Sequence, residues 1–428
     1  MEICMNRTLL NALSFCTCAA TTVKYSMEAL IEEGFEELAL SETFELKRGG
    51  KYFINVFDTT LIAFVVGKDI KDLKDIRLLA AHTDSPAFSI KPNPQLKTGK
   101  YGKLNVEVYG GPILNTWLDR PLSVAGKVCV KSDKVFKPQI KIVDFMRPIM
   151  LIPNLAIHMN RDVNKGVELN KQTHLLPLVT MMNETADEEF FMDMLSKELG
   201  VVKEDILDYE LFAYCCNEPF YVGKEAEFIL APRIDNIVSV YSCLEAITAD
   251  ANDEALNIIA LFDNEEVGSI TKQGADSTLM KNVIQKIAKA FAFNEAEAYG
   301  IAISMDVAHA SHPNYMDKSD VTNIVNINDG VVIKKAANQG YATDCYLTGI
   351  ITEICRANDI KYQYYVNRSD IAGGRTLGSI LSSNFILRTI DIGVPVLGMH
   401  SACETVGVDD VNYATELAKN IFQMKKGD

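Results

Sequence analysis

Short runs of apolar residues, each bordered abruptly by a polar cluster, recur along this chain. Five of them cover residues 78–81, 228–231, 257–262, 300–305 and 394–399. Their length and continuous apolarity predict buried β-strands. Between them lie stretches with apolar residues at helical spacing, such as residues 237–249 and 279–293. Strands that alternate with helices predict an α/β fold with a mostly parallel central sheet flanked by helices.

The N-terminal part of the chain follows other patterns. Residues 9–23 are mildly apolar, but Asn11, Ser14 and several Thr interrupt them, so we expect an N-terminal helix and no secretion signal. Residues 27–40 carry apolar side chains at helical spacing and predict an amphipathic helix. Residues 47–66 alternate between polar and apolar positions and predict strands joined by a turn.

The middle of the chain predicts a separate domain. A chain of 428 residues is too long for one ordinary core. Residues 93–224 are rich in Val, Ile, Tyr and Pro and contain turn signals such as Gly110-Gly111-Pro112, so they indicate a mostly β structure. Because this stretch separates residues 1–92 from residues 225–428, we expect a β-rich domain inserted into a discontinuous α/β domain.

Composition excludes several classes of partner. Lys and Arg number 42 against 57 Asp and Glu, and a net charge of −15 argues against nucleic acid and against anionic membrane surfaces. No run reaches the roughly 18 apolar residues of a membrane span. The ten cysteines form no CxxC pair, and without a secretory signal they fit a reducing cytoplasm.

The polar clusters that border the apolar runs contain imidazoles and carboxylates. In open α/β sheets, ligands bind at the carboxyl ends of the strands, where several of these clusters fall. Two divalent ions about 3.5–4 Å apart activate water and polarise a carbonyl for amide hydrolysis, and zinc takes imidazole and carboxylate ligands. Such a site needs a set like His82, Asp235, Glu266, Asp306 and His400. Glu265 then remains as a general base.

Each of these residues by itself has an ordinary structural explanation. An Asp that opens a helix, as Asp235 does, is more often an N-cap, and an isolated Asp306 would usually be the same. A lone His at a strand end is more often structural than a ligand. Only the joint occurrence of these residues favours a metal site over the structural interpretation.

Taken in order, the motifs resemble the aspartyl aminopeptidase family of co-catalytic zinc aminopeptidases over nearly the whole chain. The motifs are AAHTDSP at residues 80–86, PRIDN at 232–236, FDNEEVGS at 262–269, DVAHASHPNY at 306–315 and MHS at 399–401. The resemblance implies an aminopeptidase that takes peptide substrates and uses two divalent ions. Zinc is the metal of the family, while manganese and cobalt also accept such ligands.

The resemblance also implies roles for individual residues. One ion would be bound by His82 and Asp306 and the other by Glu266 and His400, with Asp235 bridging both. Glu265 would be the general base. Asp84 would hold the imidazole of His82 and fix its tautomer.

Further motifs that resemble the family lie outside the predicted metal ligands. NTWLDR at residues 115–120 and IPNLAIHMNR at 152–161 resemble the family's dimerisation domain, which implies a homo-oligomer built from dimers, a tetrahedral dodecamer. His158 would then reach the active site of a partner subunit. His309 and His312 would lie beside the substrate, and Lys334 would meet the side chain of an N-terminal Asp or Glu.

From the residues alone, other interpretations of these positions stay open. His158 stands in an apolar run, where a histidine more often belongs to the core. The spacing of His309 and His312 could mark one face of a helix or turn. Lys334 could be an ordinary surface lysine beside Lys335.

The chain departs from the family pattern in two places, and neither involves a predicted ligand. Residues 17–22 read TCAATT where the family has a Ser-Pro turn followed by a His, and Arg375 stands where a small residue is expected.

Two alternative functions make different predictions. A carboxypeptidase or deacylase with the same metal architecture would act on N-acetylated peptides, whereas an aminopeptidase needs the free amine. An inactive assembly protein should lack a ligand or the base, and here none is missing.

Overall fold

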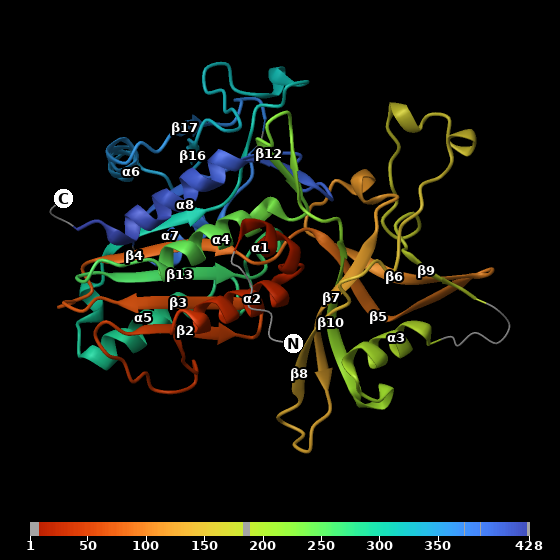
Figure 1. Ribbon diagram of the computed structural model, residues 1–428, viewed down its shortest axis with the longest axis horizontal. Coiled ribbons are helices and arrows are strands. Elements are labelled where there is room, and N and C mark those ends of the chain that lie inside the picture. The colour runs from red at the N-terminus through yellow and green to blue at the C-terminus, as the bar shows by residue number, and fades with distance from the viewer. Residues whose placement is uncertain (1–7, 183–188, 372, 386, 426–428) are drawn as a thin grey trace. The chain divides into compact units, whose positions relative to one another are not determined.

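The computed structural model describes residues 8–182, 189–371, 373–385 and 387–425, and the chain divides into two compact units (Figure 1). The first unit comprises Met1–Asp84, Pro219–Met399 and Glu404–Asp428, and the second comprises Ser85–Glu218 and His400–Cys403.

A large sheet forms the centre of the first unit. Its strands follow the order β1 (Glu36–Glu37), β2 (Lys51–Val56), β3 (Thr60–Val66), β13 (Leu256–Phe262), β4 (Ile76–His82), β14 (Gly300–Met305), β18 (Arg388–Gly393), β16 (Val331–Lys334) and β17 (Tyr362–Tyr365). The neighbours β13, β4, β14 and β18 run parallel, with antiparallel pairs on either side of them. The predicted α/β fold with a mostly parallel central sheet is therefore confirmed.

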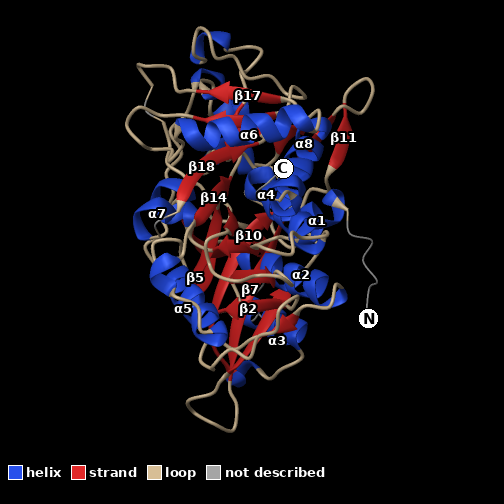
Figure 2. Cartoon of the chain, turned by 90° about the vertical axis from the view of Figure 1, so that its left-hand side faces the viewer, coloured by secondary structure: helices blue, strands red, loops and turns tan. Residues whose placement is uncertain are grey.

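Helices cover both faces of this sheet (Figure 2). One core contains side chains from α1 (Leu9–Phe15), α2 (Ala19–Glu32), α4 (Ile234–Thr248), α6 (Cys345–Ala357) and α8 (Val408–Gln423). The opposite core contains those of α5 (Leu279–Phe291) and α7 (Leu377–Asn384). Along β4, Leu79 and Ala81 face the first core while Leu78 and Ala80 face the second. A strand that is buried on both faces has no polar alternation, which explains the uninterrupted apolar runs.

The N-terminal segment contains two helices where we expected one over residues 9–23. α1 ends at Phe15 and α2 begins at Ala19. Between them, Thr21 Oγ1 accepts hydrogen bonds of 2.9 Å from the backbone nitrogens of Thr17 and Cys18. This side chain gives the backbone a polar partner outside the helix, so the helix breaks although the apolar pattern continues.

The helix predicted over residues 27–40 ends earlier, at Glu32. Gly34 adopts a left-handed backbone with φ of 78°, and the Phe35 nitrogen donates to the Leu30 carbonyl at 3.0 Å, which closes the helix. Glu36–Glu37 then forms β1, parallel to β2. The prediction was wrong beyond Glu32 because Phe35 and Leu38 pack into the two cores from the residues on either side of β1, outside the helix.

A small sheet completes the first unit. It consists of β11 (Phe220–Val222), β12 (Phe228–Ala231), β20 (Glu404–Gly407), β19 (Pro395–Leu397) and β15 (Ala308–His309), in that order. β12 and β19 correspond to the runs at residues 228–231 and 394–399, which we expected in the central sheet. Apolarity predicted that these segments are strands but could not determine which sheet they join.

The second unit is built around an antiparallel sheet. Its strands follow the order β8 (Gln139–Asp144), β7 (Leu122–Val130), β10 (Ile206–Cys215), β5 (Ala87–Thr98), β6 (Tyr101–Tyr109) and β9 (Leu178–Met181). Helix α3 (Phe190–Leu199) contributes Phe191 and Leu195 to the core of this unit. In the same core, the rings of Phe88 and Trp117 pack edge to face with centroids 4.8 Å apart.

Among the described residues, no helix combines the length and the apolarity that crossing a membrane requires.

Candidate metal centre

Three parallel strands bring the predicted site residues to one edge of the large sheet. β13 pairs with β4 so that Phe262 lies opposite His82, and β14 pairs with the other side of β4. His82 is the last residue of β4, and Asp306 follows β14 directly. Glu265 and Glu266 stand in a short 3-10 turn, Glu265–Val267, just after β13. Because parallel strands end at the same edge, these side chains lie close together.

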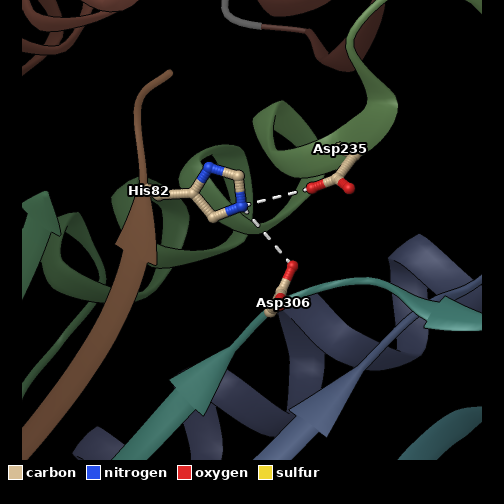
Figure 3. A group of neighbouring side chains, drawn as sticks. All are labelled: His82, Asp235 and Asp306. Atoms are coloured by element: carbon tan, nitrogen blue, oxygen red, sulfur yellow. Dashed lines mark ion pairs between the residues drawn. The ribbon is translucent and has the colours of Figure 1, made fainter. Parts of the chain in front are cut away.

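The imidazole of His82 lies at the centre of this cluster (Figure 3). Its Nε2 atom is 3.2 Å from Asp235 Oδ1 and 3.6 Å from Asp306 Oδ1. One ligating atom from each of these three residues lies within 4.8 Å of the others, and all three residues are buried. His82, Glu265 and Glu266 form a second group within the same limit.

Asp235 enters the cluster from the first turn of α4, where the backbone is not helical. Its φ and ψ are −76° and 105°, and the nearby Arg233 has a left-handed φ of 58°. Asn236 is fully buried and donates from Nδ2 to the Met305 carbonyl at 3.0 Å. This bond ties the start of α4 to the end of β14, beside Asp306.

Asp84 connects His82 to the turn that carries the two glutamates. Its Oδ1 lies 3.5 Å from His82 Nδ1 and accepts from the Glu265 backbone nitrogen at 3.1 Å. Its Oδ2 accepts from the Glu266 backbone nitrogen, also at 3.1 Å. The backbone carbonyl of Asp84 is 3.0 Å from the same His82 Nδ1. One buried residue thus orients the imidazole and holds both glutamates.

The charges of the cluster perturb one another strongly. Burial lowers the pKa of His82, but the carboxylates of Asp235, Asp306 and Asp84 outweigh it and raise that pKa well above 6.5. Burial raises the pKa of Glu265 to about 7; His82 opposes this rise, and neighbouring carboxylates add to it. A carboxyl with this pKa can both take and release a proton near neutrality.

The residues fit a divalent metal. Imidazole nitrogen and carboxylate oxygens are the donors that zinc takes in catalytic sites, and here they converge from strand ends and a turn. Several buried carboxylates around one imidazole carry an excess of negative charge that divalent cations would neutralise. His82, Asp235 and Asp306 therefore suit one ion, and Glu266 lies within reach of the same imidazole.

Lys334, at the end of β16, is almost completely buried, with 1% of its surface exposed. Its Nζ donates to the Val307 carbonyl at 3.0 Å and lies 3.6 Å from Asp306 Oδ2. It also lies 5.3 Å from the centre of the Tyr341 ring. Because Lys334 is buried, it is not an ordinary surface lysine. Its ammonium group lies next to the predicted ligand Asp306.

Of the remaining predicted residues, His309 ends strand β15, whereas His312, His158 and His400 lie in loops or turns. In the segment after Asp306, the rings of His309 and Tyr365 are 6.0 Å apart, while His312 packs against Tyr315 and accepts from the Asn314 nitrogen at 3.1 Å.

His158 is exposed in a 3-10 turn of the second unit, Ile157–Met159. His400 also belongs to the second unit, where its Nδ1 is 3.1 Å from the Gly111 carbonyl. Its role as a metal ligand stays a prediction.

Sequence reasoning missed Glu404. This residue is 2% exposed, opens β20, and accepts from the Asp235 backbone nitrogen at 2.9 Å through Oε2. A carboxylate four residues after His400 carries no local pattern that predicts such a contact. Only the pairing of β20 with β12 brings it to α4.

Comparison with known proteins gives consistent results. A family model described as Aminopeptidase I zinc metalloprotease (M18) matches residues 15–422. The chain is 42% identical over 413 residues to a probable M18 family aminopeptidase 2 of Clostridium novyi, with 95% of each protein covered.

Solved structures show the same likeness. The chain resembles one in a cryo-EM structure of the Ape4 and Nbr1 complex, with a TM-score of 0.93 and 31% identity, covering 97% of this chain and 84% of that one. It also shares the fold of mApe1 from S. cerevisiae, solved as a dodecamer, with a TM-score of 0.84 and 24% identity, covering 97% and 95% of the two chains.

Proposed function

Since this chain belongs to the M18 family of zinc metallo-aminopeptidases, we propose that it removes single residues from the N-termini of peptides with the help of two metal ions. Membership makes it a hydrolase that acts on peptide bonds. The observation that carries the detailed proposal is the convergence of His82, Asp235 and Asp306 beside the Glu265–Glu266 turn.

In the proposed metal site, His82 and Asp306 would hold one ion and Glu266 and His400 the other, and Asp235 would be shared by both. The 3.2 and 3.6 Å distances from His82 to the two aspartates support the first group. A ligand atom of Glu266 lies within 4.8 Å of one of Asp235, which supports Glu266 as a ligand next to the shared aspartate. His400 is included because of the sequence resemblance. We propose zinc, the metal of the family, while manganese and cobalt also suit this donor set.

Ions bound here would supply Lewis acidity, which lowers the pKa of water and polarises the scissile carbonyl. The chain itself supplies the proton transfer. Glu265 takes a proton from the attacking water and passes it to the leaving amine. Asp84 keeps Glu265 in place through the backbone nitrogen and fixes the tautomer of His82.

We propose that N-terminal Asp or Glu is accepted as substrate, with Lys334 as the cation that meets the side-chain carboxylate. The burial of Lys334 beside Asp306 supports a cation next to the reacting groups. His309, in β15, and His312, shortly after it, would line the substrate site. Arg375 is exposed on the segment before α7, so this departure from the family pattern lies at the surface.

We also propose a cytoplasmic homo-oligomer built from dimers. Nine cysteines lie in the described part of the chain and none of them forms a disulfide there, which suits a reducing compartment. Residues 93–224, most of which lie in the second unit, are the proposed dimerisation domain. This stretch exposes Leu155, Ile157 and Met159 around His158. The dodecameric state of mApe1 supports the same architecture, in which His158 would reach a partner's active site.

The test is a panel of peptides that differ only in the N-terminal residue, each with a free and an N-acetylated amine. We expect hydrolysis of the free peptides, none of the acetylated ones, loss of activity with a chelator, and recovery with zinc. Glu265→Gln, purified in parallel, controls for contaminating peptidases. Cleavage of acetylated peptides, or activity that survives metal removal, would contradict the proposal.

A further inference from the structure

Glu404 lies next to Asp235 because of the register of the small sheet. Strands β12 and β20 are antiparallel, and Ala231 at the end of β12 pairs with Glu404 at the start of β20. The chain turns after Ala231 and enters α4, so that the Asp235 backbone nitrogen meets Glu404 Oε2 at 2.9 Å. Both residues are buried, with 2% of Glu404 and 4% of Asp235 exposed.

The first turn of α4 needs such a partner. The first backbone nitrogens of a helix have no acceptor within the helix, and here the non-helical backbone at Asp235 and Asn236 disturbs the turn further. A hydrogen bond to a carboxylate is about twice as strong as one between neutral groups. Glu404 therefore holds the Asp235 backbone from the small sheet, while the Asn236 side chain holds the next residue from β14.

A buried carboxylate is costly to keep, and a plain structural contact at this point could be made by an uncharged side chain. Outer partners of metal ligands fix the position of the ligand and commonly carry charge. We infer that Glu404 is a positioning residue that sets the place of Asp235, the proposed bridging carboxylate, and so controls the affinity of the metal site. This inference rests on the proposed function through the ligand role of Asp235.

The test compares Glu404→Leu, which removes the acceptor, with Glu404→Gln, which keeps an acceptor oxygen but removes the charge. Metal affinity is measured by competition with a chromophoric zinc chelator, and metal content by elemental analysis. For Glu404→Leu we expect zinc affinity to fall 10- to 100-fold, the range for outer partners of metal ligands. The zinc affinity of Glu404→Gln should lie between those of Glu404→Leu and the wild type. Glu225 is an exposed carboxylate of the same unit, and Glu225→Gln should leave the zinc affinity unchanged.

A double-mutant cycle with Asp235→Asn separates positioning from a merely structural contact. If Glu404 acts through Asp235, substitution of Glu404 in the Asp235→Asn background should cost little further affinity, whereas independent effects would add. The metal-free Glu404→Gln variant should melt close to the metal-free wild type, because it keeps an acceptor oxygen for the Asp235 backbone nitrogen. Should Glu404→Leu fail to fold, the same cycle with Glu404→Gln decides, and an additive result overturns the inference.

The controls distinguish failure of this inference from failure of the proposed function. A wild-type protein that binds no zinc, or an Asp235→Asn variant with unchanged zinc affinity, would refute the ligand assignment itself. Zinc affinity that depends on Asp235 but is unchanged in both Glu404 variants would overturn the inference alone.

Discussion

Asp84 illustrates how much of this site depends on single side chains. Its carboxylate lies against the His82 ring and accepts from two consecutive backbone nitrogens, those of Glu265 and Glu266. The proposed base and a proposed ligand are thus adjacent on a turn that a third acid holds. Two neighbouring carboxylates on a turn do not easily bind the same ion, so the pair can divide into one ligand and one base.

Glu265→Gln should lower turnover by about 10² to 10⁴ while both metals stay bound, since proton transfer contributes about this much to such reactions. The glutamine keeps the shape of the side chain but cannot take a proton. Glu266→Gln should instead weaken one metal site, because a charged ligand is lost. Turnover and elemental analysis measure the two effects. If Glu265→Gln loses metal and Glu266→Gln keeps it, the two roles are exchanged.

Lys334→Met should lower the preference for acidic over neutral N-terminal residues. A hydrogen bond to a charged group contributes enough that loss of the cation should reduce kcat/KM for acidic substrates about tenfold or more. Neutral substrates should be affected less. Lys335→Met, at the next position, is the control. An equal loss for both substrate classes would mean that Lys334 serves Asp306, 3.6 Å away, and does not read the substrate.

Among the helices and strands, the sequence predicted those features that a local pattern of apolar residues determines. The runs that became β13, β4 and β14 are apolar on both faces because helices cover both, and this burial is visible as an uninterrupted pattern. The end of α2 was not predicted, since Phe35 and Leu38 continue the apolar spacing after the chain has left the helix at Glu32. The spacing of apolar residues shows which side chains are buried. It does not show where the backbone leaves the helix.

The residues of the candidate site also divide into those that could be predicted from the sequence and those that could not. His82, Glu265, Glu266 and Asp306 could be grouped from the sequence because parallel neighbouring strands end at one edge. The contact of Glu404 with Asp235 spans 169 positions and depends on the pairing of two four-residue strands. No periodic pattern in the sequence encodes that register. Likewise, the burial of Lys334 follows from the position of β16 in the sheet, which its local sequence does not reveal.

Asp410 joins α8 to the loop before β16. Its carboxylate accepts from the Asn328 and Gly330 backbone nitrogens at 2.6 and 2.8 Å. Burial raises its pKa from 3.8 to about 7, against the effect of these two bonds. Between these pH values the folded protein therefore binds a proton that the unfolded chain releases. The stability from this group is present below pH 3.8 and is lost as the pH rises through about 7.

Asp410→Asn should accordingly flatten the pH dependence of the unfolding free energy between about pH 4 and 7, by at most about 1.4 kcal/mol per pH unit. Urea unfolding of the metal-free protein at several pH values measures the slope. Asp409→Asn, at the exposed neighbouring position, is the control. An unchanged slope in Asp410→Asn would show that this carboxyl does not titrate differently in the folded and unfolded states.

At the scale of the whole molecule, the central question is whether one chain forms a complete active site. The segment around His158 exposes Leu155, Ile157 and Met159, with exposed fractions of 51%, 52% and 71%. Three apolar side chains exposed along five residues indicate a surface that becomes covered. The resemblance implies that a second copy covers it and that His158 then serves the partner's site. Mixed oligomers test this directly, because each of two copies can supply a residue that the other lacks.

His158→Ala and Glu265→Gln should each be nearly inactive alone and should regain activity when they are mixed and allowed to exchange subunits. In a mixed dimer, the subunit that carries His158→Ala keeps its own Glu265 and receives His158 from the partner, so that one of its two sites is intact. Random pairing of equal amounts makes half of the dimers mixed, so about a quarter of the wild-type activity should return. Light scattering should show an oligomer for both variants, and a mixture kept from exchanging should stay inactive. If exchange is demonstrated by mass and activity does not return, then His158 acts within its own chain or not at all. Recovery in the mixture cannot arise from either variant folding better, because each site that regains activity needs one residue from each copy.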